Sequence, residues 1–117
     1  MSQTTTTWHG EKPKIVCLCG STRLVDEFNK QRQKLTLEGN IILSIEIVTS
    51  QSQKDDPQHS NPEMKAMLDE LHKRKIDLAD EVFVLNVGGY IGESTRLEIA
   101  YARVHGKPVS FLEPTNY

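Results

Sequence analysis

Four short apolar runs alternate with segments of helical spacing along this chain of 117 residues, and the alternation limits the folds it can adopt. The first run, Lys14-Ile-Val-Cys-Leu-Cys19, stops at Gly20 and reads as a central strand covered on both faces. Further strands are expected at residues 41–48, 81–86 and 107–112. Strands that alternate with helices favour right-handed crossovers and a parallel sheet. We therefore predict an α/β three-layer sandwich with a small, mostly parallel sheet, of the Rossmann- or flavodoxin-like kind.

Three amphipathic helices are expected between these runs. The first should end before Gly39, a residue typical of helix C-termini. The second should begin with Asn61 as N-cap, Pro62 at the first helical position and Glu63 in the first turn. The predicted buried stripes are Leu24, Phe28 and Leu35 in the first helix, Met64, Met67, Leu68, Leu71 and Leu78 in the second, and Leu97, Ala100, Tyr101 and Val104 in the third.

The length fits one domain that buries about two thirds of the surface exposed in the unfolded chain. Residues 1–13, with four consecutive threonines and Trp8, read as a flexible N-terminal tail, and residues 14–117 as a single domain. Residues 49–61 are polar and contain Pro57, which predicts a long loop of the kind that often serves as a lid.

The formal net charge of -2 argues against a nucleic-acid polymer as partner. No stretch approaches the roughly 20 apolar residues of a membrane span, and the N-terminus lacks the layout of a signal peptide. A cytoplasmic protein without membrane contact is therefore expected. Cys17 and Cys19, the only cysteines, should share one face of their strand. They are too few for a four-ligand zinc site unless histidines or carboxylates contribute, so we expect reduced packing thiols and neither a metal nor an organic cofactor.

Two glycine-bearing turns, Gly20–Arg23 and Gly88–Gly92, should lie at the carboxyl edge of the sheet, where α/β folds bind ligands. The first offers backbone N–H groups, the hydroxyls of Ser21 and Thr22 and a guanidinium, which together suit a phosphate. An ordinary capped turn explains the same residues. The turn lacks both the NTPase loop pattern and the complete dinucleotide fingerprint.

Two carboxylates have both structural and functional explanations. Thr95-Arg-Leu-Glu98 matches a capping box, in which Glu98 would serve its own helix start. Asp77 falls in the last turn of its helix, where the helix dipole disfavours an anion, although Lys73 could compensate. Asp80 competes with Asp77 for any role. Spacing alone leaves these alternatives open.

Three segments together resemble the nucleoside 2-deoxyribosyltransferase superfamily, which includes the 2'-deoxynucleoside 5'-phosphate N-hydrolases and related nucleotide N-glycosidases. They are CLCGSTR, RKIDLADEVFVLN and GESTRLEIAYARVHGKPV, and the resemblance spans roughly residues 14–112. It implies that residues 14–117 form a catalytic domain that cleaves or transfers the N-glycosidic bond of deoxynucleosides or their 5'-monophosphates. The segment GGYIGESTRLE also resembles the motif of cytokinin-activating phosphoribohydrolases.

The resemblance implies roles for individual residues. Glu98, in the sequence Glu98-Ile-Ala-Tyr101, would be the nucleophile, and Asp77 would assist it. Gly20, Ser21 and Arg23 match the turn that holds the 5'-phosphate. Where the family commonly has an aspartate or serine, this chain has Gly92.

Ser94 or Glu93 could substitute at that place. Ser94 would favour a phosphorylated substrate, whereas Glu93 would favour a free nucleoside. A carboxylate suits this chemistry, because it stabilises or traps the oxocarbenium character that develops at C1'. The alternative from another class is a noncatalytic nucleotide-binding or sensing module. A short open sheet leaves a pocket that a neighbour could complete, so we expect a homo-oligomer, a dimer or higher.

Overall fold

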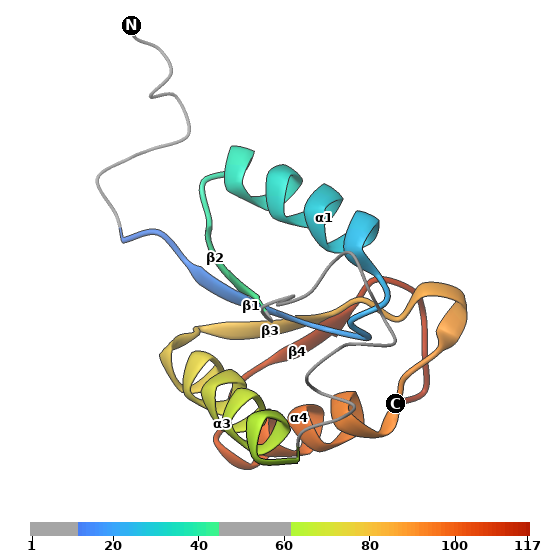
Figure 1. Cartoon of the computed structure of the whole chain (residues 1–117). Helices are drawn as coiled ribbons and strands as arrows, with labels where there is room; N and C mark the ends of the chain where they lie inside the picture. The colour runs from blue at the N-terminus through green and yellow to red at the C-terminus, as the bar shows by residue number, and fades with distance from the viewer. Residues whose placement is uncertain (1–11, 45–61) are drawn as a thin grey trace, which may run out of the picture.

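The computed structural model describes residues 12–44 and 62–117 (Figure 1). Its elements are β1 (Ile15–Cys19), α1 (Val25–Leu37), β2 (Ile41–Ser44), α3 (Pro62–Leu78), β3 (Glu81–Val84), the 3-10 helix η2 (Val87–Gly89), α4 (Glu93–Val104) and β4 (Val109–Phe111). The four strands pair in parallel, with α1 on one face of the sheet and α3 and α4 on the other (Figure 1). The predicted α/β architecture with a parallel sheet is confirmed.

Some predictions fall on residues that are not described. They concern most of the N-terminal tail, the far end of the second strand, the polar loop at 49–61 and the N-cap Asn61. The start of α3 at Pro62 agrees with the prediction. In the described part of the chain, no helix has the length and apolar character needed to cross a bilayer.

The strand order is β2-β1-β3-β4, so the chain runs outward from β1 to β2 and then returns to pair β3 on the other side of β1. The gap between the carboxyl ends of β1 and β3 is therefore the point where the strand order reverses. Crevices at such points bind the ligands of open α/β sheets. The turn after β1 and the segment after β3, which were predicted to carry the ligand contacts, both begin there.

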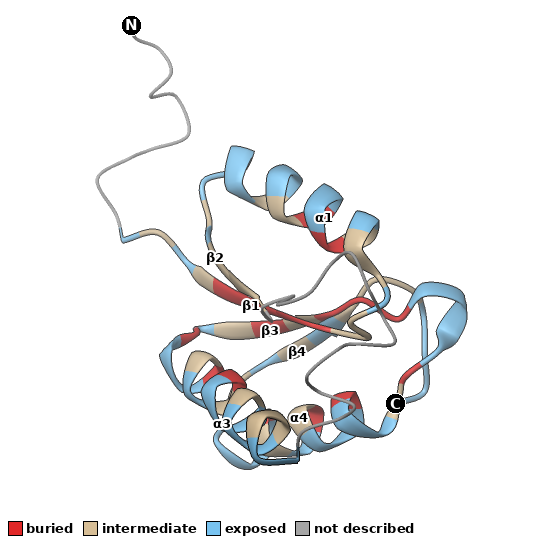
Figure 2. Ribbon diagram, viewed as in Figure 1, coloured by how far each residue is buried: buried red, intermediate tan, exposed pale blue. Residues whose placement is uncertain are grey.

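The core consists of one apolar cluster on each face of the sheet (Figure 2). On the α1 face, Leu18 packs with Phe28. On the other face, Cys17 and Cys19 pack with Ile76 of α3 and with residues of α4. The prediction that both cysteines share one face of β1 is confirmed. Burial of a side chain as large as Phe28 contributes about 1.5–3 kcal/mol.

Two glycines are required by the backbone near β1 and α1. Gly39 has φ 95° just beyond α1, a left-handed conformation that favours glycine at a helix end. A Cβ added at Gly20 would lie 3.3 Å from both the Cβ and the carbonyl oxygen of Leu85 and 3.4 Å from Cζ of Phe28. Glycine therefore lets the turn after β1 lie close against the end of β3.

The predicted stripes of α3 and α4 were only partly right, because Met64, Leu68 and Tyr101 are half-buried but the fully buried positions differ. His72 and Ile76 are the buried residues of α3, whereas Met67, Leu71 and Leu78 are exposed. In α4 the buried residues are Thr95, Ile99 and Ala102, whereas Leu97 and Val104 are 64% and 81% exposed. The prediction followed hydropathy alone, but polar side chains, His72 in α3 and Thr95 in α4, occupy part of each buried face.

Candidate active site

A cavity of about 290 Å³ lies at the reversal of strand order. Its wall is built by the turn after β1, the N-terminal half of α4 and one face of α3. This volume is close to the lower end of the range of about 300–1,000 Å³ that small-molecule sites occupy. Of the residues predicted as ligand contacts, it is lined by Gly20, Ser21, Thr22, Gly92, Ser94 and Glu98. The predicted residues of two separate turns and one helix therefore meet in one pocket.

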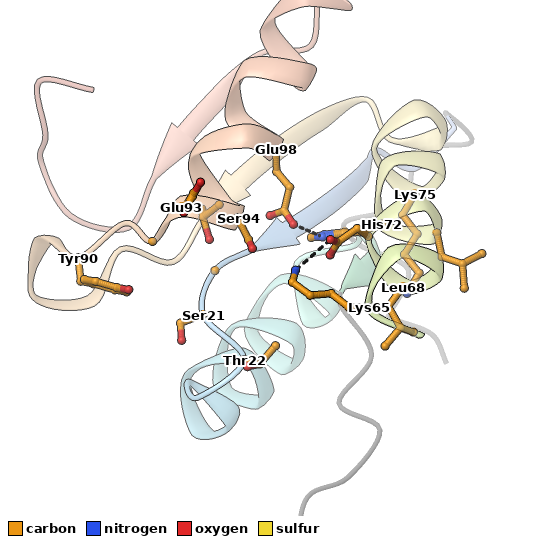
Figure 3. Close-up of a pocket in the computed structure, with 15 residues that line it drawn as sticks. Ser21, Thr22, Lys65, Leu68, His72, Lys75, Tyr90, Glu93, Ser94 and Glu98 are labelled. Carbon is orange, nitrogen blue, oxygen red and sulfur yellow. Dashed lines mark hydrogen bonds and ion pairs between the residues drawn. The ribbon is translucent and has the colours of Figure 1, made fainter. Parts of the chain in front are cut away.

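Glu98 forms a buried pair with His72 at the back of this pocket. Oε2 of Glu98 lies 2.8 Å from Nδ1 of His72, and their side chains are only 13% and 4% exposed. In Figure 3, Glu98 extends from α4 toward α3, and a dashed line joins it to the imidazole. A charged hydrogen bond of this length is strong and fixes both side chains.

The capping-box interpretation of Glu98 is wrong. α4 begins at Glu93 with Gly92 as its N-cap, and no side chain caps it. Glu98 is therefore the sixth residue of the helix, beyond the reach of the first turn's N–H groups. Its carboxylate contacts the neighbouring helix instead.

The second carboxylate oxygen, Oε1 of Glu98, is buried and has no hydrogen-bond partner among the described residues. An unsatisfied buried acceptor is costly, and native structures keep such groups mainly where strain, a ligand or a reaction explains them. Because Glu98 also lines the pocket, a bound ligand is the natural partner of this carboxylate. This orphan oxygen is the clearest chemical feature of the site.

His72 connects Glu98 to the two cysteines of β1. Burial alone would lower the pKa of His72, but hydrogen bonds with Cys17 and Glu98 outweigh it and raise the pKa to about 10. Nε2 of His72 lies 3.6 Å from Sγ of Cys19 and 3.3 Å from the carbonyl oxygen of Leu18. The imidazole thus has partners at both nitrogens, which hold it in place behind Glu98.

Arg23, predicted to hold a phosphate, does not line the cavity. Its side chain is exposed, and its backbone N–H donates to Oγ of Ser21 at 3.2 Å. Gly20, Ser21 and Thr22 of the predicted phosphate-binding turn thus line the pocket, whereas the Arg23 guanidinium does not.

Asp77 does not meet Glu98 either. Its Oδ1 accepts a hydrogen bond of 2.7 Å from the Tyr101 hydroxyl, and its Oδ2 lies 3.2 Å from Nε of Arg74. Asp77 and His72 are five residues apart, which places them about 140° apart around a helix. Asp77 is therefore turned away from the pocket, and His72 is the residue of α3 that contacts the candidate nucleophile.

Asp80, the alternative to Asp77 for a functional role, also has a structural partner. Oδ2 of Asp80 accepts a hydrogen bond of 2.8 Å from the backbone N–H of Ile15, at the start of β1. It thus lies at the amino edge of the sheet, opposite the pocket.

If the chain has the base-releasing activity that its motifs imply, Asp77→Asn is expected to leave the rate within about twofold of the unmodified protein, because Asp77 does not line the cavity and its exposed ion pair contributes only about 0–1 kcal/mol to stability. Initial rates measured on equal amounts of folded protein test this. A loss of about a hundredfold would instead place Asp77 in the chemistry, which would require α3 to rotate in the complex.

Several residues of the pocket wall were not anticipated as ligand contacts, His72 and Asp69 among them. Lys65 and Lys75 reach it from α3, and Tyr90 reaches it from the segment before α4 (Figure 3). Nζ of Lys65 lies 2.9 Å from Oδ2 of Asp69, and Nζ of Lys75 donates to the Ser44 carbonyl oxygen at 2.6 Å. A signal did exist, because residues 65, 68, 72 and 75 recur at helical spacing.

The segment before α4 is held by a buried asparagine. The Asn86 side chain accepts a hydrogen bond of 2.8 Å from the Glu113 N–H and donates one of 3.0 Å to the Glu113 carbonyl. The Glu113 carboxylate accepts a further bond of 2.9 Å from the Gly88 N–H. These bonds fasten the turn that leads to Tyr90 and Gly92, so one wall of the pocket is anchored to the C-terminal segment.

Comparison with known protein families, with curated proteins and with solved structures found no match for this chain.

Proposed function

We propose that this protein is an enzyme that cleaves or transfers the N-glycosidic bond of deoxynucleosides or deoxynucleoside 5'-monophosphates, with Glu98 as nucleophile. One observation carries the proposal: Glu98 is buried at the pocket wall, with one oxygen held by His72 and the other without a partner. A carboxylate fixed in this way suits attack on an anomeric carbon. The resemblance of Glu98-Ile-Ala-Tyr101 to the family's nucleophile motif supports the same role.

In the proposed reaction, a carboxylate oxygen of Glu98 bonds to C1' while the bond from C1' to the base nitrogen breaks. Water, or a second base, then attacks C1' and releases the carboxylate. Water as acceptor makes the enzyme a hydrolase, and a second base makes it a transferase. His72 acts as a positioning residue, because its hydrogen bond fixes the Glu98 side chain.

The departing base needs a proton or a hydrogen bond. Asp77, to which the resemblance assigned this role, is turned away from the pocket. Among the described residues that line the cavity, Asp69 and Glu93 are the other carboxyl groups. We assign the role of acid to one of these two.

The pocket composition supports a 5'-monophosphate over a free nucleoside. Hydroxyl groups of Ser21, Thr22 and Ser94 line it, and two lysines of α3 add positive charge to the same wall. Hydroxyl and ammonium donors suit phosphate oxygens. Asp69 and Glu93 favour an uncharged sugar instead, because a carboxylate repels phosphate.

Two further expectations stay predictions. The cytoplasmic location rests on the sequence. Self-association is supported by an apolar groove of about 340 Å³ that Leu97, Ala100, Tyr101 and Val104 line together with polar residues of α3. Exposed apolar surface of this kind often marks a contact with another protein.

Chromatography of free base tests the proposed function. The full chain is incubated with the four deoxynucleosides, their 5'-monophosphates and the corresponding ribonucleotides, with and without an acceptor base. We expect base release from deoxynucleoside 5'-monophosphates in preference to the free nucleosides. Calorimetric binding of nucleotides without any base release would favour the noncatalytic binding module, and release from ribonucleotides alone would favour a phosphoribohydrolase.

A further inference from the structure

We propose that Cys17, Cys19 and His72 form a buried site for a thiophilic divalent cation, with Zn²⁺ as the best-fitting ion. The inference does not rest on the proposed reaction, because it is argued from the contacts among these three side chains and not from any substrate. It revises the expectation that the two cysteines are only packing thiols. That expectation depended on the absence of further ligands, and His72 of α3 now supplies one.

The ligand atoms already lie at distances suited to one ion. One atom from each of the three side chains lies within 4.8 Å of the others. Sγ of Cys19 and Nε2 of His72 are 3.6 Å apart. On a tetrahedral zinc ion, bonds of about 2.3 Å to sulfur and 2.0–2.1 Å to nitrogen separate these two atoms by about 3.6 Å.

The surroundings of His72 match those of a metal-bound histidine. Such a histidine coordinates through one nitrogen and donates its other N–H to a carboxylate or carbonyl group. Here Nδ1 contacts Oε2 of Glu98 at 2.8 Å, and Nε2, which faces Cys19 and the Leu18 carbonyl, would coordinate the cation after losing its proton. Glu98 would thereby fix the tautomer and the ring orientation that coordination requires.

The position of the three residues in the fold also suits a metal. The cysteines come from consecutive inward positions of β1, while His72 comes from the middle of α3. All three are buried. A cation would therefore join strand to helix in the core, and two thiolates would neutralise its charge in a region that disfavours isolated ions.

A backbone oxygen lies close enough to serve as the fourth ligand of the proposed ion. The carbonyl oxygen of Leu18 lies 3.3 Å from Nε2 of His72 and 4.0 Å from Sγ of Cys17. Oxygen and nitrogen ligands of a tetrahedral zinc ion are separated by about 3.4 Å. This carbonyl or a water molecule would complete the coordination.

Zinc and cobalt binding to the full chain, kept reduced, tests the proposal. We expect about one Zn²⁺ per chain after dialysis, a higher melting temperature, and protection of both cysteines from a thiol-specific reagent. Co²⁺ should give a thiolate-to-cobalt charge-transfer band in the unmodified protein, which needs no variant to interpret. A stoichiometric ion without that band, or no bound ion, would overturn the proposal.

Variants assign the site. Cys17→Ser and Cys19→Ser should each weaken the charge-transfer band and the double variant should abolish it, whereas His105→Ala, which changes an exposed histidine, should keep it. Glu98→Gln should weaken zinc affinity about 10- to 100-fold, as expected for loss of a carboxylate that supports a ligand. Retention of full affinity in both cysteine variants would place the ion elsewhere in the chain and refute the site. Base release plays no part in these measurements, so the proposed function can fail separately.

Discussion

Glu98→Gln is expected to reduce base release by a factor on the order of 10³ or more, which corresponds to a barrier higher by about 4 kcal/mol. The amide occupies the same volume and can still contact His72, but it is a far poorer nucleophile toward C1' than a carboxylate. The measurement is the initial rate of base release, at equal concentrations of protein with matching circular dichroism spectra.

Glu70→Gln is the matched control, since this glutamate is an exposed residue of α3 that pairs with Arg74 and does not line the cavity. It should keep its rate within about twofold, because exposed ion pairs of this kind have little energetic effect. Equal rates for Glu98→Gln and the unmodified protein would remove Glu98 from the chemistry.

His72→Leu is expected to lower the free energy of unfolding by about 3–5 kcal/mol, the usual effect of removing one partner of a buried ion pair. The substitution removes the imidazole and leaves the Glu98 carboxylate buried beside an apolar side chain. Neither carboxylate oxygen then has a hydrogen-bond partner among the described residues. Urea unfolding followed by circular dichroism measures the change. A chelator should be present, so that a bound cation does not contribute to the difference.

The double variant His72→Leu with Glu98→Leu distinguishes loss of the pair from general damage to the core. Removing both charges eliminates the buried unpaired carboxylate, so the double variant should be more stable than His72→Leu alone. Simple addition of the two single effects would show that the pair does not couple, and would contradict the buried charged hydrogen bond described above.

The fold could be predicted largely from the sequence because its strongest signals are local. The apolar run of β1 ending at Gly20, the helix start at Pro62 and the helix end before Gly39 all appear as expected. Their order then leaves few topologies, since parallel strands need crossovers of one hand. Strand ends were less well predicted, with β3 and β4 shorter than expected, because pairing with neighbours decides where a strand stops.

The site could be predicted only in part. The two turns and Glu98 do meet in one pocket, because the carboxyl ends of adjacent parallel strands share one edge of the sheet. The assignment of Asp77 was not supported, because the rotation of α3 depends on which face packs against the sheet. That face carries His72, whose burial depends on tertiary partners in β1 and α4. Hydropathy cannot show such partners, and it placed exposed Leu71 and Leu78 in the core instead.

Peptide mass spectrometry after a rapid acid quench tests the central claim most directly. The protein is mixed with a deoxynucleoside 5'-monophosphate that supports base release, quenched within the first turnover, digested and mapped. The account predicts that the peptide containing Glu98 gains the mass of one deoxyribose 5-phosphate, and that fragmentation places the sugar on that glutamate. Base release with the sugar attached to another side chain, or with no modified peptide at any quench time, would contradict Glu98 as the nucleophile.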